Sequence, residues 1–108
     1  MGGINMESCV NDIPKCFSLG GLDYQVEIKE FVAEGKNYGE WNGVTCTLSI
    51  AQKVGIDKVT TDRKAQTFYH ELVHAILDFI SREDLNNDEC FVNSFAQALY
   101  DFNKTKLY

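Results

Sequence analysis

Residues 61–80 read TDRKAQTFYHELVHAILDFI, and this stretch decides the fold because it has the pattern of one amphipathic helix. Thr60, Thr61 and Asp62 are residue types that favour a helix N-terminus. Apolar side chains recur at helical spacing and predict a buried face made of Ala65, Phe68, Tyr69, Leu72, Val73, Ile76, Phe79 and Ile80. The opposite face is polar and carries Thr67, His70, Glu71, His74 and Asp78.

Both histidines of the chain, His70 and His74, lie on this polar face. Residues i and i+4 of a helix lie one above the other, so the two imidazoles can bind one tetrahedral Zn²⁺ at about 2.0–2.1 Å. Glu71 then lies beside the metal, where it can take a proton from a metal-bound water, as the glutamate does in H-E-x-x-H sites. The alternative is two partly exposed histidines on an ordinary amphipathic helix. That alternative does not explain why they bracket a glutamate on the polar stripe.

The composition is that of a single domain and limits the class of partner. At 108 residues the chain can bury a single core without disulfides. Lys and Arg number 10 against 16 Asp and Glu, a net charge of −6 with no basic cluster. This argues against nucleic acid or an anionic membrane surface as the partner and favours a polypeptide. No apolar run is long enough to span a bilayer, and residues 1–7 lack the plan of a signal peptide, so we expect a cytoplasmic protein.

The four cysteines show no C-x-x-C pair, so we expect free thiols and no separate structural zinc site. Cys46 and Cys90 fall in apolar patterns and are predicted to lie in the core. Cys9 and Cys16 lie in a weakly patterned stretch, where a thiolate could cap the metal and hold an enzyme latent.

The chain before the helix predicts a small sheet. Residues 1–20, with Pro14 and a Gly-Gly pair, are predicted to be an irregular lead-in to one domain over 21–108. Residues 22–29 alternate as a half-buried strand does. Two further strands, 38–41 and 44–50, flank Asn42-Gly43, a pair that favours a two-residue type I′ turn. Residues 51–59 are expected to be a connection, so three strands precede two helices. This order predicts an α+β fold with a small antiparallel or mixed sheet.

A second helix is predicted after the polar stretch 81–87, capped by Asn87 or Asp88. Two histidines leave a catalytic zinc one protein ligand short. Glu89 is the best candidate for the third ligand, because it lies in the first turn of this helix on the side that must pack against the histidine-bearing helix. Three acidic residues that precede the helix are rivals: Glu83, Asp84 and Asp88. Glu89 could instead be an N-terminal acid favoured by the helix dipole.

Two runs, HELVH at 70–74 and ECFVNSFAQAL at 89–99, together carry a resemblance to a known family. They resemble the gluzincin metallopeptidases, in particular the ImmA/IrrE-like and minigluzincin families of phages, mobile elements and prokaryotes, over about residues 22–102. The resemblance implies that His70, His74 and Glu89 bind zinc and that Glu71 is the general base. It also implies that the last strand before the helix, 45–50, is an edge on which an extended substrate peptide lies.

Several further side chains are candidates for supporting roles. The chain has no third histidine to stabilise an oxyanion, and the tyrosines that could replace one are Tyr69, which we expect in the core, Tyr100 and Tyr108. Asn93 and Asp78 could orient the metal ligands or simply face solvent. Tyr38 and Trp41 could line a substrate groove or pack in the interior.

These observations favour a single-domain zinc-dependent endopeptidase that holds one Zn²⁺. The alternative is a catalytically silent, zinc-stabilised protein-binding module of a phage or mobile element, or a latent enzyme with residues 1–20 across the cleft. The sequence does not determine the cleavage preference or the oligomeric state, and a monomer is compatible with it.

Overall fold

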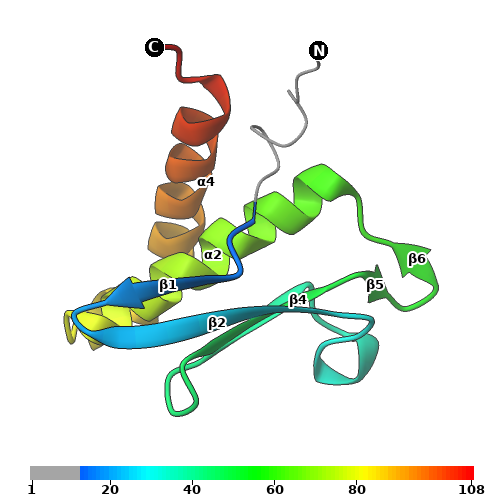
Figure 1. Cartoon of the computed structure of the whole chain (residues 1–108), viewed down its shortest axis with the longest axis horizontal. Helices are drawn as coiled ribbons and strands as arrows, with labels where there is room; N and C mark the ends of the chain where they lie inside the picture. Colours follow the sequence, from blue (N-terminus) through cyan, green and yellow to red (C-terminus); the bar gives the residue numbers. More distant parts are fainter. Residues whose placement is uncertain (1–12) are drawn as a thin grey trace.

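The fold is built on a four-stranded mixed sheet, seen in a computed structural model that describes residues 13–108 (Figure 1). The strands, in chain order, are β1 (Cys16–Leu19), β2 (Leu22–Lys29), β3 (Gly39–Asn42) and β4 (Thr47–Ala51). Their order across the sheet is β1-β2-β4-β3. β1 is antiparallel to β2, β2 is parallel to β4, and β4 is antiparallel to β3. The predicted α+β class is confirmed, with four strands in this sheet instead of three.

The prediction of an irregular lead-in is wrong for Cys16–Leu19, because this segment forms β1 and pairs with β2. A glycine turn joins the two strands, with Gly20 at φ 56° and Gly21 at φ 90°. Phe17 of β1 stacks on Tyr24 of β2 with ring centroids 5.2 Å apart. A strand of four residues is too short for its alternation to stand out in the sequence. The rest of the predicted lead-in, residues 1–12, lies outside the described residues.

The hairpin between β3 and β4 has a four-residue loop, so the predicted two-residue type I′ turn is wrong. Asn42 pairs with Thr47, which leaves residues 43–46 in the loop. The Asn42 Oδ1 atom accepts hydrogen bonds from the backbone N–H groups of Val44 at 2.9 Å and Thr45 at 3.1 Å. Asn42 therefore stabilises the start of the loop through its side chain and does not occupy the centre of the turn. Cys46 closes the loop in the left-handed region, at φ 54°.

The strand that the resemblance placed at an edge is internal, and the two edges of the sheet are β1 and β3. β4, which falls within the predicted strand 44–50, lies between β2 and β3 and is internal. The chain leaves β2, passes through the short 3-10 helix η1 (Ala33–Gly35), forms β3 at the edge, and returns as β4 between the two. The expected connection over 51–59 forms a separate small hairpin of β5 (Lys53–Val54) and β6 (Asp57–Lys58).

The two predicted helices are confirmed as α2 (Thr61–Phe79) and α4 (Glu89–Thr105). The Thr60 Oγ1 atom caps α2 by accepting from the backbone N–H of Arg63 at 3.1 Å. Asp88 Oδ1 caps α4 in the same way, by accepting from the backbone N–H of Phe91 at 3.1 Å. Between them lies a short helix, α3 (Glu83–Asn86), that the sequence pattern did not indicate. Within residues 13–108, no helix is both long and apolar enough to cross a membrane.

Helix α2 is the middle layer of the molecule, with one core cluster on each side. Figure 1 shows α2 lying over the sheet, with α4 (orange to red) against α2. The first core cluster joins the sheet to α2 and consists of Tyr24, Leu48, Ile50, Phe68 and Ala75. The second core cluster joins α2 to α4 and consists of Val73, Leu77, Val92 and Ala96. The two chain positions predicted to end the buried face, Phe79 and Ile80, are instead half exposed because they lie beyond both clusters.

Candidate metal centre

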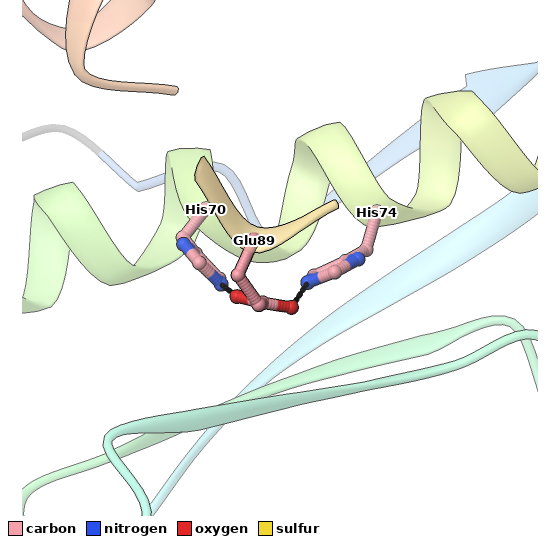
Figure 2. A group of neighbouring side chains, drawn as sticks. All are labelled: His70, His74 and Glu89. Atoms are coloured by element: carbon pink, nitrogen blue, oxygen red, sulfur yellow. Dashed lines mark ion pairs between the residues drawn. The ribbon is translucent and has the colours of Figure 1, made fainter. Parts of the chain in front are cut away.

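Two helices bring the three candidate ligands together. His70 and His74 come from α2, and Glu89 is the first residue of α4. The Nε2 atom of His70 lies 3.7 Å from Glu89 Oε1, and the Nε2 atom of His74 lies 3.7 Å from Glu89 Oε2. Figure 2 shows the carboxylate between the two imidazoles, with one oxygen toward each. One ligand atom from each residue can be chosen so that all three lie within 4.8 Å of one another.

Packing and capping explain why Glu89, and not a nearby acid, occupies this place. Val73 and Val92 of the second core cluster hold the first turn of α4 against α2. Asp88 uses its carboxylate to cap α4, and Asp84 binds Arg82 at 2.8 Å. Within residues 13–108, the grouping of metal-binding side chains contains His70, His74 and Glu89 and none of the rival acids.

The orientation of His74 is fixed by two contacts. Its Nδ1–H donates to the amide oxygen Oδ1 of Asn86, 2.5 Å away on α3. Because an amide oxygen can only accept, the proton of the neutral ring lies on Nδ1 and the Nε2 lone pair faces the cluster. The Trp41 indole stacks on the imidazole with centroids 6.0 Å apart and planes 19° apart. Sequence reasoning missed Asn86, since one asparagine in a polar, turn-rich stretch carries no signal of a histidine partner.

His70 is held in a setting that favours its neutral form. Burial lowers the pKa of His70, and the neighbouring His74 lowers it further, while Glu89 and a hydrogen bond with the Asn93 side chain act in the opposite direction. Asn93 therefore lies beside a candidate ligand, where it can orient the His70 ring. Asp78, the other residue considered for such a role, is exposed and lies outside the ligand group, close to the β3–β4 loop at Gly43.

Glu71 is buried, although the helical pattern placed it on a polar stripe. Its exposed fraction is 8%. Burial raises the pKa of Glu71 to about 7, and the charges of Glu89 and Glu40 add to the effect. The cover comes from β3, which approaches α2 closely at Gly39. A Cβ atom on Gly39 would lie 2.4 Å from the Thr67 Cγ2 atom and 3.2 Å from the Glu71 Cγ atom. A glycine at this position is therefore what allows the edge strand to lie beside the candidate base.

A cleft of about 610 Å³ opens beside the cluster. His70, Glu71, Glu89 and Asn93 line it near the candidate ligands. Its walls are α2, α4 and the segment that runs into β3, and the other lining residues are Lys36, Asn37, Tyr38, Gly39, Arg63, Gln66, Thr67, Ala96, Gln97 and Tyr100. The cleft is large enough for several residues of a peptide.

The structure places the three candidate tyrosines in different surroundings. Tyr100 lines the cleft, but its hydroxyl donates to Asp62 Oδ1 at 3.4 Å. Asp62 precedes His70 by eight residues on α2, about 12 Å along the helix axis. Tyr69 packs against both core clusters, as expected, and Tyr108 is exposed at the end of the chain. Of the two aromatic residues near the hairpin, Tyr38 lines the cleft, while Trp41 packs against the first core cluster and His74.

The cysteines take no part in the ligand group among the described residues. Cys16 lies in β1, at the opposite edge of the sheet from β3. Cys46 is half-buried and packs against the first core cluster, in agreement with the prediction. The prediction for Cys90 is wrong, because this residue is exposed. It precedes the buried Val92 by two positions on α4, which turns it about 200° away from the interface with α2. Cys9 lies outside the described residues.

The donor set fits a zinc ion. Two imidazole nitrogens and one carboxylate oxygen are the protein ligands of one common class of catalytic zinc site, which leaves a fourth position open. The Glu89 side chain is 64% exposed, so the cluster is accessible from solvent. The same donors also suit iron(II).

Comparisons of the chain with protein-family models, with curated proteins and with solved structures find no match.

Proposed function

We propose that the protein is a zinc-dependent endopeptidase of the gluzincin type. The observation that carries the proposal is the convergence of His70, His74 and Glu89 beside a peptide-sized cleft that the buried Glu71 also lines. His70, Glu71 and Glu89 line the cleft directly. The two runs at 70–74 and 89–99 that resemble gluzincins contain all four residues.

Each residue has a defined task in this proposal. A zinc ion held by the three ligands supplies Lewis acidity toward water and toward the scissile carbonyl. Glu71 accepts the proton of the attacking water and delivers it to the leaving amine. A pKa of about 7 suits both transfers, because a general base is most effective when its pKa lies near the working pH. Asn86 and Trp41 hold the His74 ring so that its Nε2 atom faces the cluster.

The proposed substrate is a polypeptide that lies extended along β3. This strand is the sheet edge beside the cleft, and an edge strand presents unpaired backbone N–H and C=O groups to which a peptide can add. Tyr38 and Gly39 line the cleft at the start of this strand. β3 thus takes the place that the resemblance assigned to residues 45–50. The proposed setting is the cytosol, where the free thiols of Cys16, Cys46 and Cys90 would stay reduced.

One observation favours a second candidate, a zinc-stabilised binding module without turnover. Both histidines of the chain are candidate ligands, so neither is left to stabilise an oxyanion. The hydroxyl of Tyr100, which lines the cleft, donates to Asp62 instead. A module of this kind would bind peptide along β3 and keep zinc for stability.

The test measures metal content and peptide cleavage on the same samples of wild type and Glu71→Gln. Zinc is quantified by elemental analysis, and cleavage is followed on labelled casein and on a peptide mixture read by mass spectrometry, with and without a chelator. Glu83→Gln is the matched control, because Glu83 is an exposed glutamate of α3 outside the ligand group.

We expect about one equivalent of zinc in all three proteins and chelator-sensitive cleavage in wild type and Glu83→Gln only. Zinc binding without cleavage in wild type would favour the binding module. Full activity in Glu71→Gln would refute the proposed base, and a protein that binds no metal would refute both candidates.

A further inference from the structure

Both acidic and basic side chains line the cleft. Glu71 and Glu89 lie at the end that holds the candidate ligands. Lys36 and Arg63 also line the cleft. Within residues 13–108, neither cation forms an ion pair with a carboxylate, although the chain carries a net charge of −6. These two cations share one cleft and have no ion-pair partner, so an anion bound in the cleft could pair with both.

The Arg63 guanidinium is held in place by an aromatic side chain. It lies over the Tyr38 ring, 4.8 Å from the ring centroid. A second cavity of about 250 Å³ adjoins this pair and shares both residues with the main cleft. Lys58 and Asp57 are among its other lining residues. A guanidinium above a ring face can still donate two parallel hydrogen bonds, the arrangement that a carboxylate accepts best.

The position of Arg63 on α2 fixes its distance from the candidate ligands. Arg63 precedes His70 by seven residues, which is nearly two helical turns, so both side chains leave the helix on the same face. The separation along the axis is about 10 Å. An extended peptide advances about 3.3 Å per residue, so this separation corresponds to about three residues of substrate.

We infer that the end of the cleft formed by Lys36 and Arg63 binds a substrate carboxylate about three residues from the scissile peptide bond. The inference rests on the proposed peptidase function and adds a substrate class to it: peptides with an acidic side chain, or with a free C-terminus, at that distance.

The probes are peptide hydroxamates, in which the hydroxamate binds zinc and the peptide extends into the cleft. In one series the peptide lies on the N-terminal side of the hydroxamate, and in the other it lies on the C-terminal side. The two series test both directions along β3. Each series carries either glutamate or glutamine at the third residue. In the second series a further pair ends at the third residue as a free carboxylate or as an amide. This pair separates a main-chain carboxylate from a side-chain carboxylate.

Affinities are measured by calorimetry on zinc-loaded wild type, Lys36→Gln, Arg63→Gln and the control Lys64→Gln. Lys64 is adjacent to Arg63 in α2 and carries the same charge, but it is not among the residues that line the cleft. In one series we expect the carboxylate member to bind about tenfold more tightly than its neutral partner in wild type and in Lys64→Gln. Arg63→Gln should reduce this ratio to about one, and Lys36→Gln should reduce it partly.

Equal affinities of all acidic and neutral partners in wild type, or weak binding of every hydroxamate to the zinc-loaded protein, would overturn the inference and leave the metal site standing. The inference would also be overturned if Lys64→Gln lowered the ratio of acidic to neutral probe affinity as much as Arg63→Gln does. The preference for the acidic probe would then come from the net charge of the protein. A protein that binds no zinc fails at the proposed function instead.

Discussion

Replacing Glu71 with glutamine should change how the stability of the metal-free protein depends on pH. The Glu71 carboxyl is buried, and burial is the main reason why its pKa is raised from 4.5 to about 7. Glutamine has nearly the same shape as a protonated glutamate but cannot ionise. The variant therefore isolates the cost of placing a negative charge at this position.

The sign and size of the effect follow from proton linkage. Between about pH 4.5 and 7 the unfolded chain has lost the Glu71 proton while the folded protein keeps it, so the free energy of unfolding falls as pH rises. A pKa rise from 4.5 to about 7 corresponds to about 3 kcal/mol, at about 1.36 kcal/mol per pKa unit. The penalty is absent below pH 4.5 and complete above pH 7. Glu71→Gln should gain about 3 kcal/mol relative to wild type across this window.

Urea unfolding of both proteins in the presence of a chelator, at intervals from pH 4 to pH 8.5, measures this difference. Glu83→Gln, at an exposed glutamate, should follow wild type at every pH. The free energies of unfolding of Glu71→Gln and wild type could instead differ by the same amount at pH 4.5 and pH 8. The pKa of the carboxyl would then not be raised by burial, and the argument that it suits a general base would fail.

Three further substitutions test the packing around the site. Gly39→Ala places a methyl group against Thr67 and should lower the free energy of unfolding by about 1–3 kcal/mol, measured in urea; a neutral effect would mean that β3 does not lie so close to α2. Asn86→Ala removes the hydrogen-bond partner of His74 and should weaken zinc binding by about 10–100-fold in competition with a chelating dye, and unchanged affinity would argue against this role. Asp88→Ala removes the cap of α4 and should cost about 1 kcal/mol in the same urea assay, whereas no loss would show that the cap is dispensable.

The helices were predictable because their signals are local. The spacing of apolar residues along 61–80 and the Asp88 cap both act within a few turns of chain, and the structure has α2 and α4 where these signals placed them. The grouping of Glu89 with the two histidines followed from one more step, since the apolar stripe of α4 had to face α2.

The sheet was less predictable because its details depend on residues far apart in the chain. Whether β4 lies at the edge or inside is decided by its pairing with β2, which no local pattern records. Glu71 appeared to be solvated because the helix alone shows a polar stripe, and only the close approach of β3 at Gly39 buries it. The contact of Asn86 with His74 likewise depends on where α3 lies after the chain turns.

The position of α4 has a consequence for how the molecule opens. α4 is held mainly by α2, through the second core cluster, whereas the first core cluster ties α2 to the sheet. A helix held by a single interface is a natural unit of partial unfolding, which can detach while the rest of the protein stays folded. Glu89 belongs to this unit and the two histidines do not. An ion bound by all three residues would stabilise the docked helix, since its binding free energy adds to the free energy of that local opening. Metal binding would then make the docking of the last helix more stable.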